Sequence, residues 1–223
     1  MHQSKSKKIF LYFFLFIFIG TLNNKNFNKL NLIKIDDIKV SGLSEKNNYD
    51  LIDRLNFLKI SNLLFLEKTK IIDIVDPHSL VEEYTVFKIY PSGLDIKIKQ
   101  TKFLAQMKIQ DDNFLLGSNG KLTKVLELKE GIPFIFGNFK NKNFFELKRA
   151  IDQTNFEFDK IQKLFFYKSG RWDIETKNGL LIKLPKNEIS KSLNLLIIFL
   201  KHNENKNIKE VDLRQNNQII ING

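Results

Sequence analysis

The feature that most constrains this chain is an unbroken apolar run close to its N-terminus, Ile9–Ile19. Three lysines, Lys5, Lys7 and Lys8, precede the run, and Asn-rich sequence follows it. A positive flank followed by an apolar stretch is typical of an export signal, with the lysines kept on the cytoplasmic side. We therefore expect the bulk of the chain to lie on the far side of a membrane.

Two interpretations of this run stay open, a cleaved signal and a retained anchor. The run has 11 residues, or 14 with Gly20–Leu22, whereas a helical span usually needs about 20. Cleavage is disfavoured because no small-x-small site follows, and Lys8 and Lys25 can lengthen the effective span by snorkelling. We therefore expect a cytoplasmic tail over 1–8, a single transmembrane helix over 9–24 as the anchor, and a linker over 25–32.

Composition narrows the classes of function. The formal net charge is +11, which invites a nucleic-acid-binding interpretation. The excess is nearly all lysine, spread from Lys5 to Lys209 without a dense block. We interpret it as solvated surface, with an anionic partner or lipid headgroups as the alternative. The chain has no cysteine, which excludes disulfides and thiolate metal sites.

Residues 33–101 have the pattern of a small α+β domain. A β-like segment ends at Ser41-Gly42, and apolar residues at helical spacing follow over 48–58 and 68–75. Residues 80–99 then form a predicted hairpin around Pro91-Ser92-Gly93. The order strand, helix, helix, strand, strand predicts a three-stranded sheet with two helices on one face.

Residues 102–223 predict a β-rich domain with flanking helices. Asn143 and Glu146 form a capping-box pattern ahead of a helix whose expected core face is Phe144, Leu147 and Ile151. A second, strongly apolar helix is expected over 188–200, and Pro133–Gly137 is expected to be a buried connection. Strands are predicted over 103–109, 114–116, 161–167, 172–176, 180–184, 211–214 and 218–221.

The last predicted strand, Gln218–Ile221, has no later strand to cover it. An exposed edge of this kind can accept a partner strand through backbone hydrogen bonds. The alternative is a strand in the interior of the sheet, and the sequence does not decide between the two.

No catalytic constellation is found. The three histidines, His2, His78 and His202, lack metal-ligand spacing and have no nearby nucleophile. Paired carboxylates such as Asp36-Asp37 and Asp111-Asp112 are adjacent in sequence, so on a strand they point to opposite faces. No phosphate-binding loop is present. We predict a protein that is not an enzyme, with no cofactor, no metal and no small-molecule substrate.

The order of these parts resembles the FtsQ (DivIB) family of bacterial cell-division proteins, over roughly residues 5–222. The resemblance implies that the first domain is of the POTRA type and the second an FtsQ-type β-domain. It is carried by short motifs in sequence order: Ile38–Gly42, Val86–Ile96, Ile132–Gly137, Arg171–Ile174 with Asn178-Gly179 and Leu184-Pro185, and Val211–Arg214.

The resemblance implies a non-enzymatic divisome scaffold in the cell inner membrane, single-pass and of type II, with its bulk in the periplasm and enriched at the septum. It implies that the protein recruits and holds FtsB-like and FtsL-like bitopic partners, with FtsB added to the terminal strand. Carried over to this sequence, the partner-binding residues are Arg171, Arg214, Gln215, Gln218, Ile219, Ile220 and Ile221. The alternatives are that Arg214 only pairs with a neighbour and that Ile219 and Ile221 belong to the core.

Two other functions stay open at this point. One is a POTRA-containing accessory protein of envelope protein assembly or secretion, although such proteins usually carry repeated POTRA units or a long β-barrel. The other is an exported enzyme of unknown chemistry.

Overall fold

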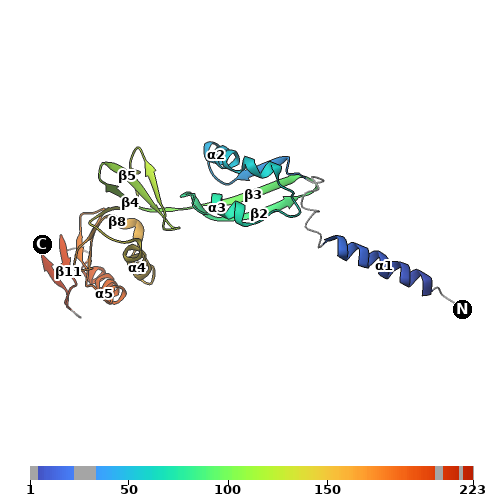
Figure 1. Cartoon of the computed structure of the whole chain (residues 1–223). Coiled ribbons are helices and arrows are strands. Elements are labelled where there is room, and N and C mark those ends of the chain that lie inside the picture. Colours follow the sequence, from blue (N-terminus) through green and yellow to red (C-terminus); the bar gives the residue numbers. More distant parts are fainter. Residues whose placement is uncertain (1–4, 23–33, 204–207, 216–217, 223) are drawn as a thin grey trace. The chain divides into compact units, whose positions relative to one another are not determined.

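The computed structural model describes residues 5–22, 34–203, 208–215 and 218–222. The linker predicted over 25–32 lies outside the described residues. The chain divides into two compact units, Met1–Gln100 and Thr101–Gly223 (Figure 1). Each unit is described by itself.

The first element is the helix α1 (Lys5–Leu22). It includes residues 9–22 of the transmembrane anchor that was predicted over 9–24. The side chains of Ile9–Ile19 are between 46% and 75% exposed. Among the residues that the structure describes, none of the helices combines the length and the apolar character needed to cross a membrane.

The rest of the first unit is a three-stranded sheet with two helices. The sheet has the order β1-β3-β2, in which β3 pairs with β1 in parallel and with β2 in antiparallel fashion. The predicted order of strand, helix, helix, strand, strand is confirmed. The elements are β1 (Asp37–Ser41), α2 (Glu45–Leu55), the 3₁₀ turn η2 (Asn56–Ile60), α3 (Thr69–Val75), β2 (Val81–Ile89) and β3 (Gly93–Gln100).

Alternation along β3 builds the core of this sheet. Leu94, Ile96 and Ile98 are buried, whereas the residues between them are not. Period-two alternation puts every second side chain on the face that the helices cover. Helices α2 and α3 supply the opposing side chains, Leu51, Leu55, Ile71 and Val75, all of them buried.

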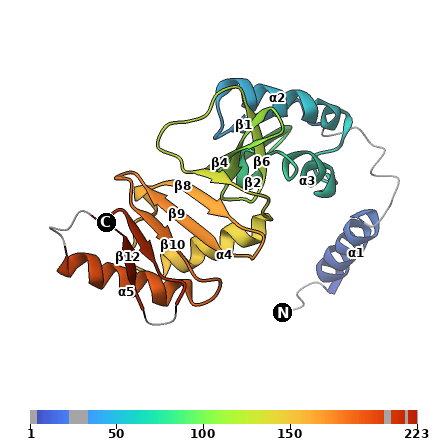
Figure 2. The same cartoon turned by 90° about the vertical axis from the view of Figure 1, so that its left-hand side faces the viewer.

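The second unit is built on one nine-stranded mixed sheet with the order β12-β11-β10-β9-β8-β7-β4-β5-β6 (Figure 2). Two helices and a 3₁₀ turn connect its strands. The elements are β4 (Phe103–Ile109), β5 (Asp112–Gly117), β6 (Leu122–Val125), β7 (Phe134–Phe136), α4 (Asn141–Asp152), η3 (Phe158–Lys160), β8 (Ile161–Phe166), β9 (Trp172–Thr176), β10 (Leu181–Lys183), α5 (Ile189–His202), β11 (Glu210–Asp212) and β12 (Ile220–Asn222).

One row of aliphatic side chains crosses this sheet in register. Its members are Ile135, Leu164, Ile174, Ile182 and Val211, each the cross-strand partner of the next and each buried. Helices α4 and α5 pack on this face through Phe144, Leu147, Ile151, Leu193 and Leu196. Full burial of one such aliphatic side chain stabilises the fold by about 1.5–3 kcal/mol.

The structure differs from the sequence-based expectation in three places. Pro133–Gly137 is not a connection, because β7 within it pairs in parallel with β4 and β8. Asn143 is not the helix cap: α4 begins at Asn141, and the Oδ1 atom of Asn143 accepts a hydrogen bond from the Lys140 N–H at 3.0 Å. Strand β6 was not predicted. Strands β6 and β7 are four and three residues long, too short to show a period of two.

Gly137 follows β7 and has a φ of +103°, and a Cβ atom placed there would lie 2.2 Å from the Phe166 carbonyl oxygen. Gly137→Ala should therefore lower the free energy of unfolding of the second unit by about 2–3 kcal/mol, through backbone strain and this overlap. Gly179→Ala is the matched control, because Gly179 has a φ of +84° with open space around it. Gly179→Ala should lower the free energy of unfolding by about 1 kcal/mol. Urea unfolding checks both values, and equal losses would contradict the role of the close approach.

Candidate functional site

The strand that ends the described chain lies at the edge of the nine-stranded sheet. The predicted strand Gln218–Ile221 is observed as β12, Ile220–Asn222. It pairs with β11 on one side, and no strand within the described residues pairs with its other side. Of the two alternatives that the sequence left open, the structure shows the edge.

The hydrogen bonds between β10 and β11 determine which backbone groups of β12 face outward. The Leu181 N–H donates to the Lys209 carbonyl, and the Leu213 N–H donates to the Lys183 carbonyl, each at 2.9 Å. The Lys209 carbonyl and the Leu213 N–H therefore point to β10, and so do the backbone groups of Val211 between them. Backbone groups alternate along a strand, so Glu210 and Asp212 face β12.

Within β12, Ile220 and Asn222 are the register partners of Asp212 and Glu210. Their N–H and C=O groups point inward to β11, and the Asn222 carbonyl also accepts from the Lys209 N–H at 3.3 Å. Ile221 is the residue between them. Its N–H and C=O therefore point to the open edge, where they are available to another strand.

The side chain of Ile221 continues the buried aliphatic row described above. It is the cross-strand partner of Val211, but it is 42% exposed, since none of the strands in the described ranges lies on its other side. The hydrophobic core of the second unit is thus partly exposed to solvent at this edge.

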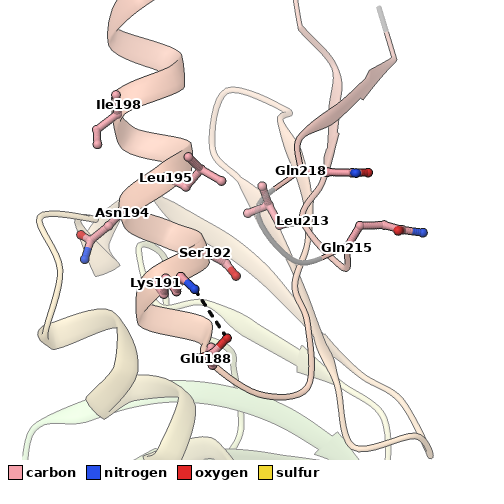
Figure 3. A pocket seen from close by; sticks show the side chains of 9 residues that line it. All are labelled: Glu188, Lys191, Ser192, Asn194, Leu195, Ile198, Leu213, Gln215 and Gln218. Carbon is pink, nitrogen blue, oxygen red and sulfur yellow. Dashed lines mark ion pairs between the residues drawn. The ribbon is translucent and has the colours of Figure 1, made fainter.

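A cavity of about 250 Å³ lies beside this edge, between α5 and the end of the sheet. Leu195 and Ile198 of α5, together with Leu213, supply its apolar lining. Figure 3 shows Gln215 and Gln218 beside it, with their amides directed away from α5. At its other end Glu188 and Lys191 form an ion pair at 4.0 Å. An apolar side chain from a strand beside β12 would find a place in this cavity.

The opposite face of the sheet carries charged side chains in register. Asp173, Lys183, Asp212 and Ile220 are successive cross-strand partners on β9, β10, β11 and β12. Neighbours on this face form two further cross-strand ion pairs, Lys163–Glu175 at 2.9 Å and Lys183–Glu210 at 2.7 Å. Acidic and basic side chains therefore alternate from strand to strand between β9 and β11.

The two predicted arginines lie on this charged face beside carboxylates, and only Arg214 is hydrogen-bonded to its neighbour. The Nε of Arg214 donates to both Asp212 oxygens at 2.8 Å, and its Nη2 also contacts Asp212. Arg171 lies with its guanidinium carbon 4.4 Å from the centre of the Tyr167 ring and its Nε 3.5 Å from the Asp173 Oδ1. Arg214 therefore does pair with a neighbour, as one of the sequence-based alternatives expected.

The two carboxylates have opposite pKa shifts. Burial raises the pKa of Asp173, whose side chain is 2% exposed, while Arg171 and a hydrogen bond from Tyr167 oppose that shift. Hydrogen bonds from Arg214 lower the pKa of Asp212. The same pair raises the pKa of the Arg214 guanidinium. Asp173 is therefore costly to ionise, whereas Asp212 is stabilised as the anion.

The predicted residues divide between the two faces and the loop. Arg171, Arg214 and Ile220 lie on the charged face, and Ile221 lies at the edge on the core face. Ile219 is half-buried and packs on the core, while Gln215 and Gln218 are exposed beside the cavity. The contribution of Leu195 and Ile198 was missed. The available signal was that α5 is apolar beyond its core stripe, at these two positions.

No metal centre is seen in this arrangement: within the described ranges no group of three or more histidines and carboxylates could hold a metal ion. The Nδ1 of His78 accepts a hydrogen bond from the Leu80 N–H at 3.3 Å, and His202 contacts the Ile198 carbonyl. The chemistry that the edge offers is recognition by backbone pairing, apolar contact and charge.

Asp173→Asn and Asp212→Asn form a matched pair with opposite expected effects. The raised pKa of Asp173 means that its ionisation weakens the fold as the pH rises from about 3.9, the unfolded value, through the folded pKa. Asp173→Asn should therefore be more stable than the parent chain at pH 7, by up to about 1 kcal/mol, and this advantage should vanish below pH ~3.9.

The lowered pKa of Asp212 means that its contribution is present above about pH 3.9 and is lost as the pH falls through its folded pKa. Asp212→Asn should lower the free energy of unfolding at pH 7 by about 1 kcal/mol. Urea unfolding at pH 3.5 and pH 7 measures both variants. A loss of stability in both at pH 7 would contradict the assignment of Asp173.

Comparison with known proteins identifies the second unit. The family model described as "Cell division protein FtsQ/DivIB, C-terminal" matches residues 105–214, which contain every strand of the sheet except β12 and the start of β4. The chain also aligns with the major extracytoplasmic domain of DivIB from Geobacillus stearothermophilus. That alignment has a TM-score of 0.35 and 12% identity, over 48% of this chain and 97% of that one.

Full-length relatives extend the match to most of the chain. FtsQ of Rhizobium meliloti is 24% identical over 81% of this chain and 60% of its own length, and FtsQ of Rickettsia bellii is 24% identical over 84% and 72%. DivIB of Clostridium botulinum is 25% identical over 93% of this chain and 88% of its own length. The chain thus spans only three-fifths of the Rhizobium relative.

The matched proteins are cell-division proteins, in agreement with the prediction that the chain is not an enzyme. The family model covers the sheet that carries the candidate edge, and relatives from three genera agree with it. From these matches, the chain belongs to the FtsQ/DivIB family of cell-division proteins.

Proposed function

We propose that this chain is a divisome scaffold that holds FtsB-like and FtsL-like bitopic partners on the periplasmic side of the inner membrane, by adding a partner strand to β12. The observation that carries the proposal is the outward-facing backbone of Ile221 at the open edge, next to an apolar cavity. Antiparallel or parallel addition of one strand would extend the nine-stranded sheet by one.

The two faces of the edge define the side chains that the partner strand needs. On the core face, an apolar residue would cover Ile221 and reach the cavity lined by Leu195 and Ile198. Covering one such side chain contributes about 1–2 kcal/mol. On the charged face, a polar or acidic residue would lie next to Ile220 and near Arg214, whose side chain is 43% exposed.

In this proposal Arg171 and Arg214 are positively charged groups in defined orientations that would bind a carboxylate of the partner. The Arg214 guanidinium is hydrogen-bonded to Asp212, and the Arg171 guanidinium lies over the Tyr167 ring with its Nε 3.5 Å from Asp173. Both side chains are only partly exposed. A partner carboxylate would share a prepositioned group, so less side-chain entropy is lost on binding than with a free lysine. Gln215 and Gln218 flank the strand and provide further hydrogen-bonding groups.

The N-terminal segment is proposed as the membrane anchor of this scaffold. Support comes from α1, whose eleven apolar side chains over Ile9–Ile19 are all exposed to a degree unusual for a folded protein. The preceding lysines would keep the N-terminus cytoplasmic. The three-stranded sheet with its helices and the second unit would then lie in the periplasm, enriched at the septum, where short bitopic partners present their extracytoplasmic segments.

Ile221→Pro tests strand addition at β12. Proline removes the outward-facing donor while leaving the inward-facing groups of Ile220 and Asn222, so capture of the FtsB-like partner's periplasmic segment should fall by at least about tenfold. Capture is measured with the full chain in mild detergent. Ile221→Thr is the matched control, because it keeps the N–H donor and loses only apolar area. It should weaken capture by about threefold. Unchanged capture by Ile221→Pro would exclude addition at this edge.

Depletion of the protein tests the role in division. Cells should continue to replicate and segregate their chromosomes while failing to septate, so that they grow as filaments, as measured by microscopy with DNA staining. Re-expression of the parent chain should restore septa, whereas Ile221→Pro should not. Normal septation after depletion would overturn the divisome assignment.

A further inference from the structure

One end of the three-stranded sheet unit gathers three chain segments around the point where the chain enters it. The Ile35 N–H donates to the Ser61 carbonyl at 3.3 Å, and the Asp36 N–H donates to the Ser92 carbonyl at 2.9 Å. These bonds hold the incoming chain, the loop after η2 and the turn between β2 and β3 together. We call this end of the unit the entry end; it consists of residues 34–36, 56–65 and 89–92.

The outside of the entry end is apolar. In the segment 56–65, Leu58 and Leu63 turn inward and are fully buried. Other large apolar and aromatic side chains of the same end are exposed, by between 41% at Phe65 and 80% at Ile60. They are Phe57, Ile60, Leu64, Phe65, Ile89 and Tyr90. Apolar side chains that are exposed singly need no explanation, but a group of them on one surface marks a binding site.

The opposite end of the unit carries no such group. It consists of residues 42–44, 76–80 and 98–100, as the register of β1 and β2 on β3 shows. All of these residues are described, and none of their large apolar side chains is exposed. The apolar surface of the entry end is therefore a local feature, and the high Phe and Ile content of the chain does not explain it.

Positive charge surrounds the exposed apolar side chains. Lys34 and Lys59 belong to the entry end and are exposed. The Lys88 Nζ lies beside them in the same region, where it donates to the Leu64 carbonyl at 3.0 Å. Asp36 is the single carboxylate within the three segments. The entry end thus combines apolar side chains with an excess of basic ones, which is the chemistry that binds an anionic lipid surface.

The length of chain that precedes the entry end limits its distance from α1. Residues 23–33 separate Leu22, the last residue of α1, from Lys34. At about 3.5 Å per residue, this stretch allows at most about 40 Å between the two. If α1 is anchored in a bilayer, the membrane surface is therefore the ligand that the entry end meets at the highest effective concentration.

We propose that the entry end lies on the membrane surface, with Ile60 and its apolar neighbours in the bilayer interface and the lysines at anionic phospholipid headgroups. This inference rests on the proposed anchoring of the chain by α1. Burial of the apolar side chains and attraction of the lysines to anionic lipid both stabilise the contact. Because β3 starts at this end with Gly93, the strands of the sheet lead away from the membrane.

Quenching by spin-labelled lipids tests the contact on the full chain in vesicles. Because the chain has no cysteine, Ile60→Cys carries a single NBD fluorophore at a position that is 80% exposed. In vesicles of phosphatidylcholine and phosphatidylglycerol, lipids with a doxyl group high on the acyl chain should quench this label by at least about half. Lys99→Cys, about 20 Å further along β3, is the matched control and should lose less than about a tenth.

Flotation of the same vesicles separates this contact from the anchor. A chain that floats with the vesicles while its Ile60 label stays unquenched would overturn the membrane contact of the entry end alone. A chain that does not float would overturn the anchor as well. Disulfide-linked dimers of unlabelled Ile60→Cys, together with an unquenched label, would show that this end joins two copies of the chain, and would also overturn the lipid contact.

A charge placed among the exposed apolar side chains tests their role. Leu64→Asp, made in the Ile60-labelled chain, should reduce the quenching by about half or more, because a carboxylate is costly to bring into the bilayer interface. Tyr49→Asp is the matched control, because Tyr49 is 65% exposed on α2 and lies outside the entry end. It should leave the quenching unchanged. Equal losses in both variants would contradict a contact through Leu64.

The lipid composition tests the role of the lysines. Replacing phosphatidylglycerol by phosphatidylcholine should reduce the quenching of the Ile60 label and should remove its sensitivity to salt, because the attraction to anionic headgroups is then lost. Lys34→Gln together with Lys59→Gln should have the same effect in vesicles that contain phosphatidylglycerol. Quenching that is equal in both lipids and independent of salt would exclude recognition of anionic headgroups.

Discussion

The second unit depends on the register of one aliphatic row. Ile135, Leu164, Ile174, Ile182 and Val211 come from five strands, and they meet α4 and α5 only while all five strands keep their present pairing. A slip of one residue in any strand would turn its member of the row to the charged face. The same register sets the direction of the backbone in β12. The orientation of Ile221 is thus decided by a core that lies mostly several strands away.

The charged face follows from the same alternation and has a different energetic character. Asp212 is satisfied by Arg214, whereas Asp173 is nearly sealed from water with Arg171 at 3.5 Å. Burial of an ion pair is weak support for stability, and perturbed carboxylates are often found where a surface has a function. Hydrogen bonds to Asp212 fix the orientation of Arg214, whereas Arg171 is positioned by the Tyr167 ring and by the charge of Asp173.

Much of this fold could be predicted from local pattern. The alternation of Leu94, Ile96 and Ile98, and the helical spacing of Phe144, Leu147 and Ile151, predicted buried faces that the structure confirms. Strands of three or four residues, such as β7 and β6, lack enough positions to show a period. The cap of α4 was misplaced because Asn143 acts from inside the first turn. The pairings Arg171–Asp173 and Arg214–Asp212, and the cavity beside α5, depend on packing that spacing does not encode.

The shortness of β12 has a consequence for how the protein behaves in a crowded compartment. A long, flat, apolar edge is a template on which any unfolded chain can add a strand, and repeated addition leads to aggregation. β12 has three residues, and its one central residue, Ile221, turns its backbone outward. So short a template would bind an arbitrary strand weakly, and in the proposed strand addition a ligand would be retained only if its side chains also matched both faces. In the proposed role, the shortness of β12 would therefore select against strands with unsuitable side chains.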